Sequence, residues 1–444
     1  MSFNFLYIPI GVPTFHLESA QKEFDSSIEL LKKVSGDGIY PEEMLLSLDK
    51  LHAFMDGKKP DLVIVQNVTF ANGAYMSEVL RKFDCPVLLW TLKEPVIDGG
   101  RLRLNSLTGA YSAANVLKAF NRPFEYIFGS PTEENVKETV KAVLSAAKLK
   151  VALRELNILQ IGHTPQGFGF GRALDMEMMT KFGSNLLSIE ARELIDTAKS
   201  YTDEEVKAFL DDANKRMVGL DKIAPKNVSD FARLYKSYYE YVQKNNIGAL
   251  SSRCWPDFFT AFGTPVCAVL AILNDLKVPS SCEADTYGAL SMYMGQYLTD
   301  MPTFFGDPVS MDAKENTVTF WHCGTAACSL ARKDTGAEVG VHCNRKIGPT
   351  LEFGCKAQKQ VTIFRVGKKA DGTFRMFLSK GEALDKPKQF LGTSIVIKTD
   401  TSAENLVNNS VKAGWEPHFV VAMKDITKEI KVLCNFLNIE VEEY

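Results

Sequence analysis

The chain has 444 residues, enough for two or three domains that each bury a core of their own. Apolar residues make up 45% and charged residues 24% of the sequence, and the formal net charge is −3 with both signs interspersed. These values are typical of a globular protein, and they exclude a basic nucleic-acid-binding face or a polybasic membrane anchor as the organising feature. No run approaches about 18 consecutive apolar residues, so no transmembrane helix is expected.

The termini and the cysteines indicate the cellular compartment. The N-terminal sequence lacks the basic n-region and the long apolar h-region of a secretory signal, so we expect a cytoplasmic protein. The nine cysteines are an odd number without a Cys-x-x-Cys pair, which argues against a zinc knuckle or a thioredoxin-like centre. Most lie in apolar sequence, as Cys85 and Cys267 do, and this predicts buried free thiols in a reducing environment.

Residues 1–150 alternate short apolar runs with amphipathic segments. β-Branched runs of this length fit parallel strands that are covered on both faces. The alternation predicts an N-terminal α/β domain with an open, mostly parallel sheet. The expected strands are 3–10, 61–65, 85–90 and 124–128, and the expected helices are 18–33, 73–83, 112–120 and 132–149.

Residues 151–309 repeat the α/β pattern and form the expected central domain. The strands predicted there are 156–162 and 249–252, and the helices are 203–219, 228–245 and 264–276. Ligands in open α/β sheets bind beyond the carboxyl ends of the strands. Arg253 and Trp255 follow one strand and Glu283 follows an apolar approach, so all three are expected at such an edge.

From about residue 310 the hydrophobic period changes to that of strands. We expect strands at 316–321, 360–366, 373–378 and 393–398, with late helices at 402–413 and 426–436. The second and third of these strands should pair across the connection 367–372. This predicts a C-terminal antiparallel sheet, or small barrel-like domain, over residues 310–444.

A glycine-rich loop, Gln166–Arg172, contains Gly169-x-Gly171 but no third glycine. A dinucleotide fingerprint needs all three glycines between a strand and a helix, so a nucleotide-dependent oxidoreductase is the least favoured function. The alternative interpretation is a flexible loop whose backbone approaches another segment closely.

Glu283 is the first candidate for chemistry. Its apolar neighbours predict partial burial, where a carboxylate must be paired, protonated or metal-bound. The structural alternative is a carboxylate near a helix N-terminus, with Ser280 or Ser281 as the cap.

Asp307 and His418 complete the candidate set. Asp307 precedes Pro308, so its alternative role is to start a turn. His418 stands directly before a strand-like run. Two carboxylates and one imidazole can hold a divalent cation that keeps positions open for substrate. Their separations in the sequence match no local motif, so spacing alone does not establish the site.

His16 and His163 each follow a predicted strand at its carboxyl end and could therefore reach a site. A surface or buried, hydrogen-bonded histidine is the commoner outcome.

Over most of its length the sequence resembles the superfamily of L-fucose isomerase and L-arabinose isomerase, which are ketol isomerases. Each matching segment alone is weak evidence for the superfamily. Their order along the chain, together with the change from an α/β to a β pattern, is more specific evidence. The segments are Pro86–Trp90 with Glu94-Pro95, Ile161–Phe168, Lys181–Gly183, Cys254–Pro256, Val278–Asp285 with Gly288–Leu290, Phe305–Asp307, His322–Gly324 and His418–Val420.

The resemblance implies two Rossmann-like α/β domains followed by a β-barrel-like C-terminal domain. It also implies one divalent cation, Mn²⁺ or another such as Mg²⁺ or Co²⁺, held by Glu283, Asp307 and His418. The arabinose-isomerase branch uses two Glu and two His instead, so the fucose-isomerase pattern fits better. The chain is shorter than typical fucose isomerases, and His418 stands alone where many relatives have paired histidines. Family members are often hexamers, so we expect a homo-oligomer in which His16 or Trp90 would serve a neighbouring subunit.

The implied reaction interconverts an aldose and a ketose by moving a proton between C1 and C2 of the open-chain sugar through an ene-diolate. The cation would act as a Lewis acid, and Glu283 and Asp307 would be the catalytic acid and base. The residues expected to bind the substrate are Arg253, Trp255, His16, His163, Trp90 and Tyr287.

The substrate stays open at this point. Arg253, Arg172 and Arg345 lie near the expected site loops, and a guanidinium would suit an anionic sugar, either a phosphorylated hexose or a sulfonated one such as sulfoquinovose. The alternative for these arginines is pairing with surface acids. A second class of function is a sugar-binding relative that keeps the fold without turnover.

Overall fold

The computed structural model describes residues 3–444. Its internal contacts divide the chain into two compact units. Unit 1 comprises the residues up to Ala152 together with Lys428–Ile439, and unit 2 comprises Leu153–Thr427 and Glu440–Tyr444. The division into three domains at residues 150 and 309 stays a prediction.

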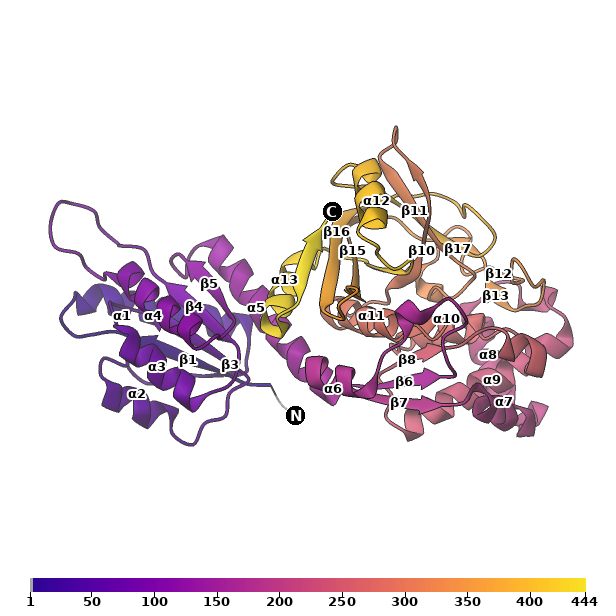
Figure 1. Cartoon of the computed structure of the whole chain (residues 1–444), viewed down its shortest axis with the longest axis horizontal. Coiled ribbons are helices and arrows are strands. Elements are labelled where there is room, and N and C mark those ends of the chain that lie inside the picture. The colour runs from indigo at the N-terminus through magenta and orange to yellow at the C-terminus, as the bar shows by residue number, and fades with distance from the viewer. Residues whose placement is uncertain (1–2) are drawn as a thin grey trace. The chain divides into compact units, whose positions relative to one another are not determined.

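Unit 1 contains a five-stranded sheet in the order β2-β1-β3-β4-β5, and every pairing in it is parallel, as expected (Figure 1). Strands β1, β3 and β4 are buried along their whole length, which explains their continuous apolar sequences. The strands are β1 (Phe5–Ile10), β2 (Gly38–Ile39), β3 (Leu62–Asn67), β4 (Val87–Thr91) and β5 (Phe124–Phe128). The helices are α1 (Leu17–Val34), α2 (Leu48–Met55), α3 (Gly73–Lys82), α4 (Ser106–Ala119), α5 (Glu134–Glu155) and most of α13 (Thr427–Leu437).

Unit 2 begins with a four-stranded sheet in the order β7-β6-β8-β9, again with every pairing parallel. Its strands are β6 (Asn157–Ile161), β7 (Asn185–Ile189), β8 (Ala249–Ser252) and β9 (Ser280–Cys282). Strand β7 was not expected from the sequence, because it lies at the edge and is only partly buried, which weakens its apolar pattern. The helices are α6 (Asp175–Phe182), α7 (Ala191–Ser200), α8 (Asp203–Arg216), α9 (Pro225–Lys244), α10 (Cys267–Asp275) and α11 (Thr286–Thr299), with short helical turns at Gly169–Gly171, Leu220–Lys222 and Phe258–Phe262.

The rest of unit 2 contains an eight-stranded sheet in the order β14-β17-β11-β10-β18-β15-β16-β19, in which β16 also pairs with β17. The expected hairpin is present as β15 and β16. The sheet is mixed rather than purely antiparallel, because the short strands β14 and β19 pair in parallel at its ends. The strands are β10 (Phe304–Asp312), β11 (Thr317–His322), β14 (Phe353–Gly354), β15 (Gln358–Lys368), β16 (Phe374–Ala383), β17 (Thr393–Thr399), β18 (Phe419–Ala422) and β19 (Glu440–Glu443). A separate hairpin joins β12 (Val339–Gly340) to β13 (Thr350–Leu351), a short turn covers Cys328–Leu330, and α12 (Ala403–Lys412) follows β17.

These elements confirm a mixed α/β fold with parallel sheets and one large later sheet. The Rossmann-like and barrel-like details stay predictions. Helix α11 packs against β8 of the parallel sheet and against β15 and β18 of the mixed sheet (Figure 1). It therefore joins the two sheets within unit 2.

Two further findings concern membrane-spanning helices and the cysteines. No helix within residues 3–444 is long and apolar enough to cross a membrane. All nine cysteines are free thiols, and eight of them are buried.

Candidate active site

The site is built around the sharp turn that joins β9 to α11. Glu283 and Ala284 both adopt left-handed backbone conformations, with φ of 59° and 54°. Such a conformation costs a non-glycine residue on the order of 1–3 kcal/mol, and strain of this kind is concentrated at functional sites. The turn leaves the Glu283 side chain 16% exposed at the carboxyl end of β9.

Asp285, rather than a serine, caps helix α11. Its Oδ1 accepts a hydrogen bond from the backbone N–H of Gly288 at 2.9 Å. The expected cap, Ser280 or Ser281, is wrong because both serines lie within β9. The serines were the expected caps because they directly precede Glu283 in the sequence. In the structure they are still part of the strand, and the helix begins only after Asp285.

Asp285 also links two other buried side chains. Its Oδ2 accepts hydrogen bonds from Nη1 of Arg365 at 2.7 Å and from Nδ1 of His418 at 2.9 Å. All three side chains are at most 1% exposed. Burial raises the pKa of Asp285, but the positive charges and hydrogen bonds of Arg365 and His418 together lower it well below its usual range. Because Nδ1 of His418 donates to Asp285, its Nε2 is fixed toward the opposite side.

Two carboxylates lie close to Nε2 of His418. Oε2 of Glu283 lies 3.0 Å and Oδ1 of Asp307 lies 3.5 Å from this nitrogen. Nε2 of a second imidazole, His322, lies 3.8 Å from Oε2 of Glu283. Strand register brings Asp307, His322 and His418 together, because Asp307 of β10 pairs with Trp321 and the preceding Gly306 pairs with Phe419. Glu283 reaches them from the turn after β9.

His322 was not assigned a role from the sequence. The motif His322-Cys-Gly was part of the resemblance, and it was the available signal for this residue. His418 therefore does not stand alone in space, although no second histidine lies near it in the sequence.

The two catalytic candidates have opposite electrostatic environments. Burial raises the pKa of Glu283, but the neighbouring imidazoles of His322 and His418 lower it to about 2. Burial raises the pKa of Asp307, and the two imidazoles offset this only in part. Glu283 is therefore held ionised, while Asp307 protonates more readily than an ordinary aspartate.

Aromatic rings surround the imidazoles. Phe305 lies 4.7 Å and Phe170 lies 5.4 Å from the ring of His418, measured between centroids. Nε1 of Trp255 donates to Oε1 of Glu283 at 3.2 Å. The glycine-rich loop does approach another segment closely, because a Cβ on Gly171 would lie 2.8 Å from Cα of Asp285.

The donor set fits a divalent cation. Ligand atoms of Glu283, His322 and His418 lie within 4.8 Å of one another, and Asp307 lies beside His418. Carboxylate oxygens with imidazoles suit Mn²⁺ or a similar ion, whereas the two other groupings in residues 3–444 contain buried thiols. The side chains of Glu283 and Asp307 are 16% and 30% exposed, so their carboxylates are accessible from outside.

Four of the six residues expected to bind the substrate lie in unit 2: Arg253, Tyr287, His163 and Trp255. Arg253 is paired with Asp257 at 2.7 Å. Tyr287 is buried in α11, and its hydroxyl donates to Glu177 at 2.8 Å. His163 is exposed in the loop after β6. Of the residues expected to bind sugar, Trp255 is the one in direct contact with Glu283.

His16 and Trp90 lie in unit 1. His16 caps α1, where its Nδ1 accepts from the backbone N–H of Ser19 at 3.3 Å. Trp90 is fully buried in β4, and its Nε1 donates to the carbonyl oxygen of Gly129 at 3.0 Å. Both contacts are structural, so the placement of these residues lends no support to a role in sugar binding.

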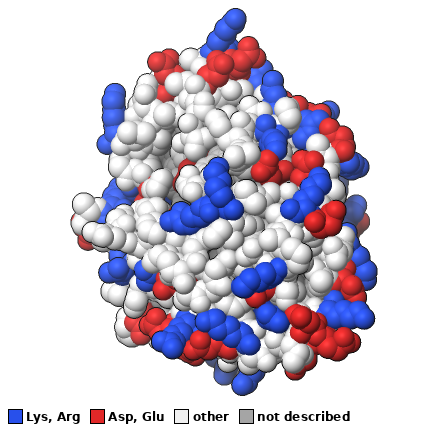
Figure 2. All heavy atoms as spheres, turned by 90° about the vertical axis from the view of Figure 1, so that its right-hand side faces the viewer, with Lys and Arg blue, Asp and Glu red and all other residues white. Residues whose placement is uncertain are grey.

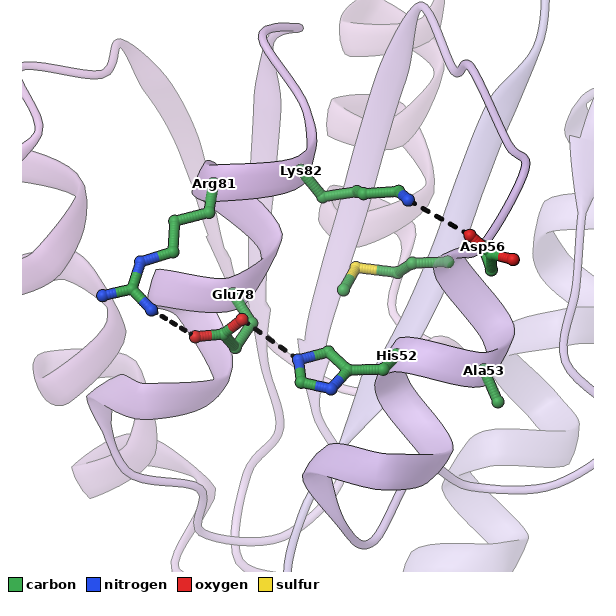
Figure 3. Close-up of a pocket in the computed structure, with 7 residues that line it drawn as sticks. His52, Ala53, Asp56, Glu78, Arg81 and Lys82 are labelled. Carbon is green, nitrogen blue, oxygen red and sulfur yellow. Dashed lines mark hydrogen bonds and ion pairs between the residues drawn. The ribbon is translucent and has the colours of Figure 1, made fainter.

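Unit 1 also has a surface groove of about 460 Å³ between α2 and α3. Figure 3 shows Glu78 between His52 and Arg81, to which it is paired at 3.0 and 2.7 Å, with Lys82 reaching Asp56 at 3.3 Å. The charged side chains that line this groove are paired with one another, so the groove is explained by the packing of α2 against α3 and not by a ligand.

Comparisons with known proteins show which family the chain belongs to. Residues 322–444 match the family model of the L-fucose isomerase C-terminal domain. The chain is 58% identical over 443 residues to a sulfoquinovose isomerase of Clostridium sp. (strain MSTE9), covering 100% of this chain and 99% of the relative. Proteins of the same name from Priestia aryabhattai and Alkalicoccus urumqiensis are 38% and 36% identical, with 99% of this chain and 98% of each relative covered.

The chain belongs to the sulfoquinovose isomerase family. This membership confirms the resemblance to fucose-isomerase-like ketol isomerases, and the chain is an aldose–ketose isomerase.

Proposed function

We propose that the chain converts sulfoquinovose, a hexose with a sulfonate on C6, into the corresponding 2-ketose. The observation that carries the proposal is the convergence of Glu283, which follows β9, Asp307, which lies within β10, and His418, which precedes β18. Oε2 of Glu283 lies 3.0 Å and Oδ1 of Asp307 lies 3.5 Å from Nε2 of His418. Full-length relatives with this activity in their names support the choice of sugar.

We assign Glu283, Asp307, His418 and His322 as the residues that would hold the cation, with Mn²⁺ preferred. When bound, the cation supplies Lewis-acid stabilisation of negative charge on the sugar oxygens at C1 and C2. Asp285 keeps His418 oriented by accepting from its Nδ1.

Proton transfer is assigned to the two carboxylates. Glu283, held ionised by two imidazoles, takes the proton from C2 of the open-chain aldose, leaving an ene-diolate. The proton is returned at C1, and Asp307 exchanges the proton between the oxygens on C1 and C2. Two carboxylates in unlike environments can divide acid and base roles in this way. The hydrogen bond from Trp255 keeps Glu283 in place.

Assay of the purified protein with a panel of aldoses and added Mn²⁺ tests the substrate. We expect kcat/KM for sulfoquinovose to exceed that for 6-deoxy-D-glucose, its counterpart without the sulfonate, by about tenfold or more, because a charged hydrogen bond contributes about 1.5–3 kcal/mol. In D₂O, deuterium should enter C1 of the ketose. Equal turnover of both sugars would reject the anionic substrate, binding without ketose formation would identify a non-catalytic relative, and absence of deuterium would contradict proton transfer.

Removal of the cation tests the donor set. Treatment with a chelator should lower kcat/KM about a hundredfold or more, because Lewis-acid stabilisation contributes several kcal/mol, and Mn²⁺ should restore it. Calorimetric titration of the chelator-treated protein with Mn²⁺ should show one site. Full activity after chelation, with no metal found in the protein, would refute the assignment. The homo-oligomer and the cytoplasmic location stay predictions.

A further inference from the structure

The face shown in Figure 2 offers no broad basic patch for an anionic sugar. On the face shown in Figure 2, Lys and Arg side chains are interspersed with Asp and Glu. The net charge is −3, and the site itself contains the carboxylates of Glu283 and Asp307. Recognition of a sulfonate therefore requires a locally placed cation that is not already neutralised.

Most cations close to the site have partners. Arg365 is paired with Asp285, Arg253 with Asp257, and Lys368 with Glu177, each at 2.7 Å. A paired guanidinium offers fewer free N–H groups and little net charge to a substrate.

Arg345 differs from these. Its side chain is exposed, and no carboxylate among residues 3–444 lies within ion-pair distance of it. Its guanidinium carbon lies 5.5 Å from the ring centroid of Trp255 and 5.0 Å from that of Phe259, so the cation rests on two aromatic rings. Stacking of this kind restricts the side chain while leaving its N–H groups directed outward.

The loop that carries Arg345 is itself held in place. It connects β12 to β13, and the backbone N–H of Lys346 donates to the carbonyl oxygen of His342 at 2.8 Å. The buried ring of His342 packs edge-on against Phe259, with 5.1 Å between centroids. The arginine is therefore presented by a defined turn.

Trp255 connects this cation to the chemistry. The indole Nε1 donates to Glu283 at 3.2 Å, while the same indole ring lies beneath the guanidinium of Arg345. The indole of Trp255 thus lies between Glu283, the carboxylate assigned to C2, and the unpaired guanidinium of Arg345. In an open-chain hexose the sulfonate on C6 lies at the end of the carbon chain opposite C1 and C2.

We infer that Arg345 is the sulfonate-binding residue of this site, held over Trp255 and Phe259 to receive the charged end of the sugar. The inference rests on the proposed function. The planar guanidinium would donate two parallel N–H groups to two sulfonate oxygens, and it would offset the repulsion between the sulfonate and the site carboxylates.

The test compares Arg345→Gln, Arg345→Lys and the matched control Lys346→Gln, which removes an exposed cation from the same loop. For sulfoquinovose we expect Arg345→Gln to lower kcat/KM by about 10- to 100-fold, mainly through KM, since a hydrogen bond to a charged group contributes about 1.5–3 kcal/mol. For 6-deoxy-D-glucose the same variant should stay within about twofold of wild type. Arg345→Lys should recover part of the loss, and Lys346→Gln should change neither sugar by more than about threefold.

The outcomes separate the inference from the proposed function. If wild type isomerises sulfoquinovose but Arg345→Gln affects the two sugars equally, or affects neither, Arg345 does not bind the sulfonate and the proposed function stands. An equal loss on both sugars would place Arg345 in support of Trp255 and Glu283. If wild type isomerises neutral aldoses alone, the proposed substrate fails and the inference fails with it.

Discussion

Replacing Glu283 with Gln should lower kcat/KM for isomerisation by about a thousandfold or more, since it removes both a cation ligand and a proton-transfer group. The amide keeps the volume of the side chain and can still accept the hydrogen bond from Trp255. It loses the charge that interacts with His322 and His418. Steady-state kinetics with sulfoquinovose measures the first effect, and calorimetric titration with Mn²⁺ should show the affinity falling in parallel.

A matched control is Glu382→Gln, which alters an exposed carboxylate on β16 of the same unit. Its activity should stay within about twofold of wild type, as is usual for surface substitutions of under about 0.5 kcal/mol. Retention of more than about a tenth of wild-type activity by Glu283→Gln would remove this residue from the chemistry.

Replacing Arg365 with Met should lower the free energy of unfolding by about 3–5 kcal/mol, because it leaves Asp285 as a buried charge without its closest cation. The same change releases the carbonyl oxygen of His418, to which Arg365 also donates at 3.0 Å. Denaturant unfolding of the chelator-treated protein, followed by tryptophan fluorescence, measures the loss. The control Arg192→Met breaks an exposed ion pair on α7 and should cost less than about 1 kcal/mol.

The double variant Arg365→Met with Asp285→Asn checks the cause. Removing both charges should recover at least about half of the lost stability, because an uncharged pair carries no buried ion, and Asn is a good helix N-cap. No recovery would show that shape, rather than charge, is responsible.

The pH dependence of the wild-type protein follows from the same pair. The pKa of Asp285 is lower in the folded state than the usual aspartate value of about 3.9. Its contribution to stability is therefore present above about pH 4 and is lost as the pH falls through the lowered pKa.

Helices and strands were predicted well where the local hydrophobic pattern is strong. Strand β8 was expected at residues 249–252 and is found at Ala249–Ser252, and the predicted hairpin is β15 with β16. Strand β7 and the two-residue strands were missed, because edge position and short length leave too little apolar periodicity to detect. Strand β10 was missed as well, because Gly306 and Pro308 interrupt its strand pattern.

The sequence by itself determined the residue types of the site: a carboxylate in an apolar approach, a second acid, a late histidine and a tryptophan after a strand. The tertiary structure decided which of the candidates meet. Register within the mixed sheet brought Asp307, His322 and His418 together, and the turn after β9 brought Glu283 to them. Buried Asp285, paired with Arg365, supports His418. The tertiary structure also left Arg345 unpaired and Arg253 paired. Distances between side chains far apart in a chain depend on sheet pairing, which local sequence patterns do not specify.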